Sequence, residues 1–240
     1  MERLIGYGTL TAEAAAFLKK TVAAVYNIFI SGGTNSGKTT FLNALSAFIT
    51  ASERVITIED SAELQLLHIE NLVRLETRNR TAEGEGQVRI SDLIRASLRM
   101  NPDRIIVGEV RGAEALDMLQ AMNTGHDGSL STGHANSAAD MLTRLETMAL
   151  GGANLPLEAV QRQISGALDL IVHLGRMRDR SRRVLSVSEV GGISHGKIQV
   201  HELFAFREEG AQSGDKCNGR LIRVGSLKNR GKLAAAGIEL

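Results

Sequence analysis

The sequence predicts an α/β protein in which a mostly parallel sheet forms three layers with helices and is extended at its C-terminal end by antiparallel strands. Two observations carry this prediction. Short apolar strands alternate with amphipathic helices through residues 27–150, the order that builds a parallel sheet. Strands of period two then follow one another directly at 168–176, 184–193 and 197–206. With 240 residues, of which 43% are hydrophobic, the chain can form one sizeable domain.

The first helix and strand lead into a glycine-rich turn. Thr11 is expected to cap a helix over residues 12–25, where apolar residues recur at helical spacing. Residues 27–31 are short, apolar and β-branched, as in a buried strand, and residues 41–49 have the spacing of a helix packed on a sheet. Strand, glycine turn and helix in this order provide the context that a phosphate-binding loop requires.

The rest of the chain continues this alternation. We expect strands at 54–60, 71–77, 104–109 and 128–132, and helices at 92–100 (capped by Ser91), 113–125, 137–150 and 157–165. The stretch at 77–87 is rich in glycine and charge and is expected to be an exposed, flexible loop. The polar, glycine-rich segment from residue 208 is expected to be a loosely ordered tail.

Composition excludes several classes of protein. A net charge of +1 recruits no polyanion and 3% aromatic residues disfavour a base-stacking surface, so no nucleic-acid partner is expected. One cysteine, Cys217, forms no internal disulfide and excludes a four-cysteine zinc module. The sequence has no signal-peptide pattern and no apolar run of roughly eighteen residues. We therefore expect a cytoplasmic protein whose membrane contact is peripheral.

The segment GGTNSGKT matches the whole pattern of a phosphate-binding (Walker A) loop. Its glycines allow a backbone path whose N–H groups point at phosphate. Lys38 adds a positive charge for the β- and γ-phosphates, and Thr39 offers a hydroxyl to Mg²⁺. An ordinary glycine-rich turn is the alternative, but few such turns lie between an apolar strand and an amphipathic helix. We expect ATP and Mg²⁺ as ligands, with the nucleotide bound by Gly32, Gly33, Thr34, Asn35, Ser36, Gly37, Lys38, Thr39 and Thr40.

Hydrolysis also requires an acidic residue near the γ-phosphate, and Glu109 ends the predicted buried strand RIIVGE. Gly108 stands where many phosphate-loop enzymes place an aspartate on the magnesium side, so another acid must serve the metal. We choose Glu59 over Asp60 and Glu63, because its strand could lie beside the phosphate-loop strand and end at the same crevice. The alternative is that these acids cap the turn EDSAEL and face solvent.

Basic residues near these acids are further candidates. Arg95 and Arg99 lie four residues apart and share one helix face, while Arg111 follows the predicted strand RIIVGE. A guanidinium suits the charge on phosphate oxygens, in cis or across a subunit boundary. A solvated helix face paired with Asp92 or Asp103 agrees equally well with the spacing.

Two histidines bracket the small-residue strand GSLST. His134 lies just beyond a strand expected to neighbour the phosphate loop, where a side chain can sense the γ-phosphate. The alternative for His126 and His134 is that one is solvated and the other hydrogen-bonded inside; two histidines alone are weak evidence for zinc. The charge run RMRDRSRR at 176–183 is interpreted as a solvated loop, with contact to anionic lipid or a partner as the alternative.

Taken together, three segments resemble the motif series of the type II/type IV secretion ATPase superfamily: GGTNSGKTT, VITIEDSAEL and LIRASLRMNPDRIIVGEVRGAEALDMLQAMNTGHDGSLSTGHANS. They correspond to its Walker A loop, Asp box, arginine-bearing helix with atypical Walker B, and His box. Within the superfamily, RLETRNR and NTGHDGSLSTGHANS are similar to the branch that powers Tad/Flp pilus assembly and is close to conjugation and effector-export ATPases. The resemblance implies a P-loop NTPase fold of the RecA-like type.

The resemblance also implies a homohexameric ring that hydrolyses ATP between subunits, at the inner face of the cell membrane. The ring would drive pilus assembly or protein transport, with an inner-membrane platform protein as partner. Carried over by position, Lys38 and Thr39 would hold phosphate and Mg²⁺, and Glu109 would act as the catalytic glutamate. The acids of the Asp box, of which Glu59 is our choice, would support metal and water, and the nucleotide site would be completed by Arg95, Arg99 and His134.

Relatives usually carry an N-terminal domain before the motor, whereas 26 residues precede the first predicted strand here. The expected division is a linker remnant at 1–26, a motor domain at 27–207 and a polar tail at 208–240. Two alternative functions stay open at this point. One is a nucleotide-binding remnant with little hydrolysis, and the other is an ATPase of a conjugative type IV secretion system.

Overall fold

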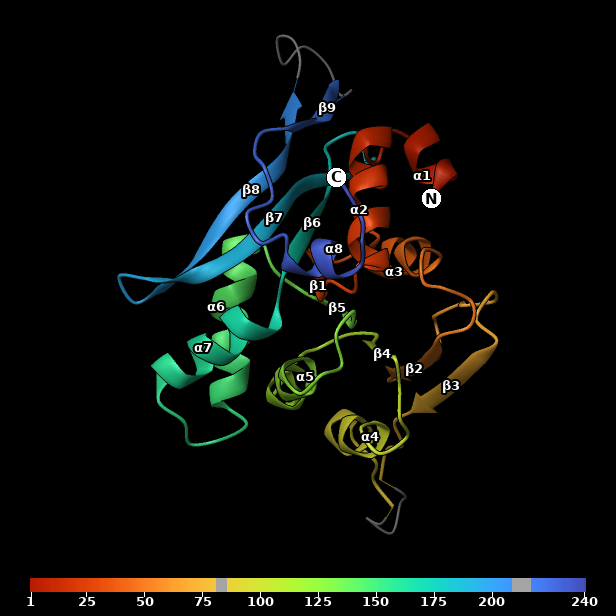
Figure 1. Cartoon of the computed structure of the whole chain (residues 1–240), viewed down its shortest axis with the longest axis vertical. Coiled ribbons are helices and arrows are strands. Elements are labelled where there is room, and N and C mark those ends of the chain that lie inside the picture. The colour runs from red at the N-terminus through yellow and green to blue at the C-terminus, as the bar shows by residue number, and fades with distance from the viewer. Residues whose placement is uncertain (81–85, 209–216) are drawn as a thin grey trace.

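The computed structural model describes residues 1–80, 86–208 and 217–240 (Figure 1). Part of the predicted loop at 77–87 and the start of the predicted tail lie outside these residues. At the edges of that loop, Arg78 and Val88 form an antiparallel bridge.

A single nine-stranded sheet runs through the described residues, in the order β3-β2-β4-β5-β1-β6-β7-β8-β9 (Figure 1). Its parallel part consists of β1 (Ile28–Gly32), β2 (Arg54–Glu59), β3 (Asn71–Glu76), β4 (Arg104–Val107), β5 (Leu130–Gly133) and β6 (Leu170–Arg176). Its antiparallel part adds β7 (Arg182–Ser194), β8 (Lys197–Glu208) and β9 (Gly219–Arg223) to β6. The predicted fold class, a parallel sheet with an antiparallel extension, is confirmed.

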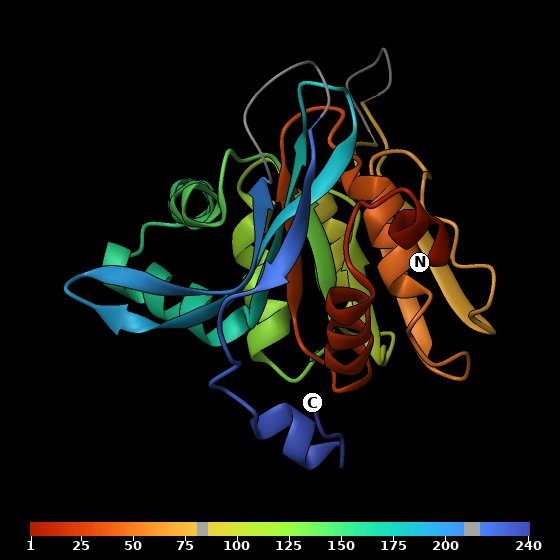
Figure 2. The ribbon, with the colours of Figure 1, turned by 90° about the horizontal axis from the view of Figure 1, so that it is seen from above.

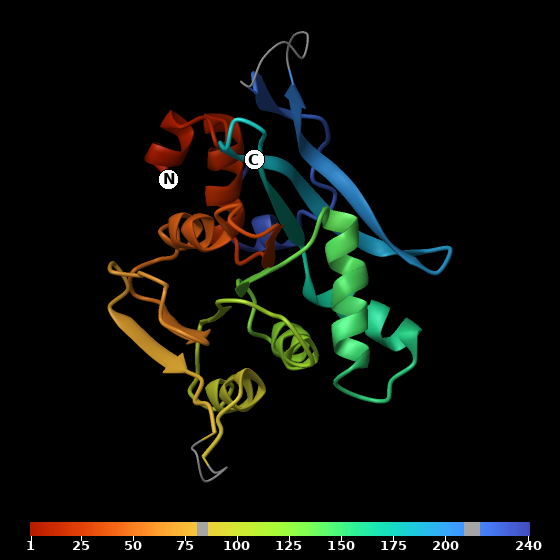
Figure 3. The same ribbon diagram turned by 180° about the vertical axis from the view of Figure 1, so that it is seen from behind.

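Helices cover both faces of the sheet (Figure 2). On one face α2 (Ala12–Ala23) and α3 (Lys38–Ser46) pack into a core with Ile28 and Ile30 of β1. The other face carries α4 (Ile90–Ser97), α5 (Glu114–Asn123), α6 (Ala138–Leu150) and α7 (Leu157–Ala167), which pack with Phe29. Figure 3 shows α6 and α7 side by side on this face. Successive residues of β1 therefore point into opposite cores, as the continuous apolar strand requires.

Of the two predicted helix N-caps, Thr11 is confirmed and Ser91 is wrong. The Thr11 hydroxyl accepts from Ala14 N–H at 3.4 Å. The structure adds a cap that was not predicted, the Ser137 hydroxyl at the start of α6. Ser91 does not cap α4, which starts one residue earlier at Ile90. The Asp92 carboxylate instead accepts the N–H of Arg89 at 3.0 Å, so this acid closes the first turn of the helix.

The expected loosely ordered tail is wrong for the residues that the structure describes. Strand β9 pairs with β8, and a short helix, α8 (Gly231–Ala235), follows it. Leu221, Leu227 and Leu233 are buried in the same core as α2 and β1. These leucines lie six residues apart with mostly polar residues and glycines between them, so no continuous helical or strand pattern of hydropathy revealed them. The helix α1 (Glu2–Gly6) was likewise not predicted.

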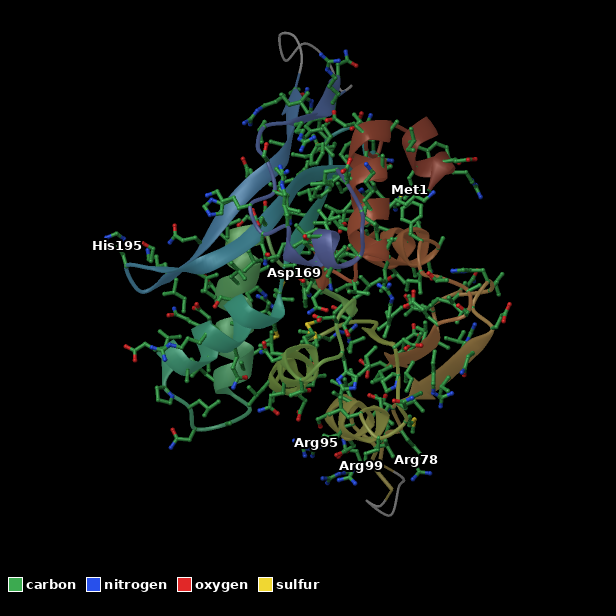
Figure 4. All side chains as sticks on the ribbon, in the orientation of Figure 1. Met1, Arg78, Arg95, Arg99, Asp169 and His195 are labelled. Atoms are coloured by element: carbon green, nitrogen blue, oxygen red, sulfur yellow. The ribbon has the colours of Figure 1, made fainter. Side chains whose placement is uncertain are left out.

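An ionic cluster holds α8 against the N-terminal ends of the parallel strands β5 and β6. Lys232 Nζ lies 2.6 Å from Asp127 Oδ1 and 2.7 Å from Asp169 Oδ2, and Figure 4 shows Asp169 beside α8. Burial raises the pKa of Asp169 above its usual value, although Lys232 opposes this shift.

In the described part of the chain, no helix is long and apolar enough to cross a bilayer.

The substitution Lys232→Met is expected to lower the free energy of unfolding at pH 7 by about 2 kcal/mol, because it leaves the carboxylate of Asp169 without its cation. Since the folded-state pKa of Asp169 is raised, its ionisation opposes folding as pH rises through that pKa. The loss should therefore shrink in urea titrations repeated at progressively lower pH. Lys228→Met, an exposed control, should change stability by less than about 0.5 kcal/mol.

Candidate nucleotide site

The loop between β1 and α3 has the backbone that phosphate binding needs. Gly37 has φ of 93°, a left-handed conformation that favours glycine, and it forms the N-cap of α3. A Cβ on Gly32 would lie 2.5 Å from both the Leu174 carbonyl oxygen and Ser36 Oγ. Both positions therefore require glycine for steric reasons.

The start of α3 suits an anion. Its N-cap offers no side-chain hydrogen bond, and its first turn carries no acidic residue. The helix dipole and the unpaired N–H groups of that turn are thus left for a negatively charged ligand. Ser36 Oγ is buried and has no hydrogen-bond partner within the described residues. The loop opens into a cavity of about 820 Å³, large enough for a nucleotide.

Lys38 is the cation of this loop and is held by the loop itself. Its Nζ donates to the carbonyl oxygens of Gly32 at 3.2 Å and Gly33 at 3.1 Å, and lies 3.4 Å from His134 Nδ1. Burial lowers the pKa of Lys38, and Arg111 contributes to the same shift, while Glu109 opposes it. The ammonium group is thereby fixed at the point where phosphate oxygens would meet it.

Glu109 directly follows β4 and lies in the same cavity. Its Oε2 accepts from Arg111 Nη2 at 2.7 Å, and its Oε1 lies 2.8 Å from His134 Nε2. Burial alone would raise the pKa of Glu109, but the hydrogen bond and charge of Arg111, followed by His134 and Lys38, outweigh it and lower the pKa. The side chain is therefore a carboxylate held from two sides.

His134 follows β5, which pairs with β1, so the structure confirms that this histidine lies beyond a strand next to the phosphate loop. Burial lowers the pKa of His134, and Lys38 adds to the shift, so the imidazole is neutral at pH 7. His126 lies near the opposite end of β5, where its Nδ1 is 3.2 Å from the Ala121 carbonyl oxygen. It takes no part in this site.

Glu59 combines the two roles that the sequence left open. Its Oε1 accepts the N–H groups of Glu63 at 2.9 Å and Leu64 at 3.0 Å, so it does cap the turn that follows β2. It does not face solvent, however, because the residue is only 4% exposed. Glu59 also lines a cavity of about 190 Å³ together with Thr39 and Glu109.

The glycine before Glu109 has a steric explanation. A Cβ on Gly108 would lie 3.0 Å from Glu59 Cγ, so a side chain there would displace Glu59. Thr39 and Glu59 fit the partial ligand set that Mg²⁺ uses beside substrate phosphates. Within the described ranges, no group of three His, Cys, Asp or Glu side chains could hold a metal by itself.

The expected position of the strand that carries Glu59, beside the phosphate-loop strand, is wrong. Strand β2 does not lie beside β1, because β5 and β4 separate them. Glu59 reaches the site by another path: β2 pairs with β4, the strand that precedes Glu109. Long-range strand order of this kind does not follow from the local pattern of either strand.

Arg95 and Arg99 do not reach this cavity within the same chain. Arg95 is exposed and pairs with Asp117 at 2.8 Å, rather than with Asp92 or Asp103. Arg99 is also exposed and lies just past the end of α4. Figure 4 shows both at the outer side of α4, near Arg78. A role across a subunit boundary stays a prediction.

Residues on the turn between β6 and β7 also border the site, although their sequence pattern did not indicate it. Arg180, Ser181 and Arg182 line the cavity, and Arg180 and Arg182 are exposed, so the basic run is solvated as expected but also borders the site. Arg182 Nε donates to the carbonyl oxygen of Asn35, in the phosphate loop, at 2.9 Å. The density of arginines was a visible signal, but only the pairing of β6 with β1 brings the turn here.

Comparison with known proteins supplies a family context. The chain matches the family described as type II/IV secretion system protein over residues 2–227. A putative conjugal transfer protein of Mycobacterium tuberculosis (strain CDC 1551) is 41% identical over 198 residues, which cover 82% of this chain and 55% of that protein.

Two solved structures are similar in fold. The VirB11 ATPase of the Brucella suis type IV secretion system, in complex with sulphate, has a TM-score of 0.67 and 34% identity, covering 73% of this chain and 53% of that one. The pilus retraction motor PilT with bound ADP has a TM-score of 0.52 and 25% identity, covering 86% and 50%. This chain thus spans about half the length of the relatives it matches.

Proposed function

The chain belongs to the type II/IV secretion system protein family, and from this premise we propose that it is an ATP-hydrolysing motor domain. One observation carries the proposal: the carboxylate of Glu109 lies in the same cavity as the phosphate loop and its Lys38. The ADP bound in the PilT structure and the sulphate present in the VirB11 structure support a nucleotide or another anion as a ligand of this chain.

In the proposed hydrolysis, different residues bind the phosphates, activate the water and hold Mg²⁺. Lys38 and the N–H groups at the start of α3 bind the β- and γ-phosphates. Glu109 orients a water and accepts its proton as the water oxygen attacks the γ-phosphorus and the bond to the bridging oxygen breaks. Mg²⁺, when bound, neutralises charge on the phosphate oxygens, and Thr39 and Glu59 would hold it.

Arg111 and His134 position the carboxylate of Glu109. Arg111 Nη2 bonds one carboxylate oxygen and Nη1 lies 3.7 Å from Asp60 Oδ2, so it links this acid to the turn after β2. His134 contacts both Glu109 and Lys38, which makes it the side chain best placed to respond to a γ-phosphate between them.

The machine that this motor serves is the finer part of the proposal. The sequence motifs favour a homohexameric ring that powers Tad/Flp pilus assembly or protein secretion, docked from the cytoplasm on an inner-membrane platform protein. The conjugal transfer relative and the VirB11 structure favour a conjugative type IV secretion ATPase as the second candidate. In either ring, Arg95 and Arg99 would act on the site of a neighbouring subunit.

Steady-state ATP hydrolysis over a wide range of protein concentration tests the proposal. Specific activity should rise with concentration as subunits assemble, and mass measured by light scattering should rise over the same range. ATP binding without hydrolysis at any concentration would instead indicate the nucleotide-binding remnant. Full activity in a dilute monomer would contradict the ring.

A further inference from the structure

We propose that Arg182 is a nucleotide-binding residue, which contacts the α- and β-phosphate part that ATP and ADP share. The proposal deepens the proposed function and rests on it only in taking a nucleotide as the ligand of the cavity. It assigns a binding role to the turn between β6 and β7 and places it at the end of the cavity opposite Glu109.

The order of the strands separates the two ends of the cavity. Glu109 and His134 follow β4 and β5, which lie on one side of β1. Arg182 begins β7, which lies on the other side of β1, beyond β6. The γ-phosphate belongs at the Glu109 end, because Glu109 acts on the attacking water. A cation that approaches the loop from the β6 and β7 side therefore meets the remaining phosphates.

The side chain of Arg182 lies on the phosphate loop itself. Its Nε donates to the Asn35 carbonyl oxygen at 2.9 Å, and its Cδ lies 3.0 Å from where a Cβ on Gly37 would stand. In the part of the chain that the structure describes, its two terminal nitrogens make no hydrogen bond or ion pair. Their planar, forked geometry matches a pair of phosphate oxygens.

The turn that presents Arg182 is held in one conformation. Met177 N–H donates to the Ser181 carbonyl oxygen at 2.8 Å, which closes the turn. Asp179 accepts from Ser181 N–H at 2.9 Å, from Ser181 Oγ at 2.6 Å and from Cys217 N–H at 3.1 Å. These bonds lower the pKa of Asp179 to about 2 and direct its carboxylate at the turn rather than at Arg182. The guanidinium is thus placed before a ligand arrives.

Like charges gather at this turn. Arg176 and Arg182 are register partners across β6 and β7, an arrangement that is destabilising when both residues carry the same charge. Arg180 adds a third cation that lines the cavity. A bound polyphosphate would offset this repulsion, which is the second reason to place an anion at the turn.

The affinities of ADP and ATP, measured by isothermal titration calorimetry, test the role of Arg182. Arg182→Gln should weaken both nucleotides by about tenfold or more, and by the same factor, because both carry the phosphates that Arg182 contacts. Arg182→Lys, which keeps the charge but loses the fork, should fall between wild type and Arg182→Gln. The matched control is Arg74→Gln, an exposed arginine on β3 that lines neither cavity described above, and it should change either affinity by less than about twofold.

Two results would overturn the proposal. One is an ADP affinity that Arg182→Gln leaves unchanged, including the case in which ATP alone is weakened, since that would place Arg182 at the γ-phosphate. The other is a wild-type chain that binds no ADP. A wild-type chain that binds ADP but never hydrolyses ATP would contradict the proposed function alone. Equal thermal melting of the variants without nucleotide confirms that folding is not the cause.

Discussion

The substitution Glu109→Gln is expected to lower ATP turnover by about 100- to 10,000-fold, the range that a positioned proton acceptor contributes. The amide keeps the shape of the side chain but cannot accept the proton of the attacking water. Affinity for ATP should not weaken, because the carboxylate contributes negative charge beside the phosphates rather than attraction to them. The change therefore separates hydrolysis from binding.

Turnover is best measured at saturating ATP and at a protein concentration where the wild type has its full specific activity. Glu76→Gln is the matched control, because Glu76 is exposed at the end of β3 and lines none of the cavities described above. It should keep wild-type turnover. If Glu109→Gln retained more than about a tenth of the activity, another residue would be the proton acceptor.

The substitution Lys38→Met is expected to lower turnover by about 100- to 1,000-fold, the range for one preorganised electrostatic contact to the reacting group. It removes the cation that Gly32 and Gly33 hold over the start of α3, so ATP should also bind more weakly. Without nucleotide, however, the protein should be no less stable. The lowered pKa of Lys38 means that the folded state holds this cation less readily than the unfolded chain does.

Thermal unfolding with and without ATP checks both parts of this expectation. ATP should raise the melting temperature of the wild type and have little effect on Lys38→Met, since a ligand stabilises only the state that binds it. Lys19→Met, an exposed change on α2, should behave as the wild type does. A large loss of stability in Lys38→Met without nucleotide would mean that the lysine is a structural residue of the loop.

Local patterns predicted most of the elements and the central residues of the site. The phosphate loop could be read directly, because each of its positions has a steric or chemical reason that is visible in the sequence, as Gly32 and Gly37 show. Glu109 and His134 could be found because residues at the ends of parallel strands reach one edge of the sheet. Their mutual contact at 2.8 Å could not, since it depends on which strands are neighbours.

The errors share a physical origin. Glu59 lines a cavity with Glu109, but it arrives by another route than the sequence indicates, because β2 pairs with β4 and is not a neighbour of β1. The arginines of the turn after β6 looked like a solvated loop, because a charge run has no period that reports its neighbours. Arg95 forms its ion pair with Asp117 on α5, 22 residues away, and not with an acidic residue close to it in the sequence.

The sequence by itself determined the phosphate loop, the alternation of strands and helices, and the acid that follows β4, because these depend on local sterics and on hydrophobic period. Tertiary structure alone decided which side of β1 each residue approaches. It placed Glu109 and His134 at one end of the cavity and Arg182 at the other, and it buried the leucines of the last segment. Strand order is a long-range property of packing, and no single segment of the chain contains it.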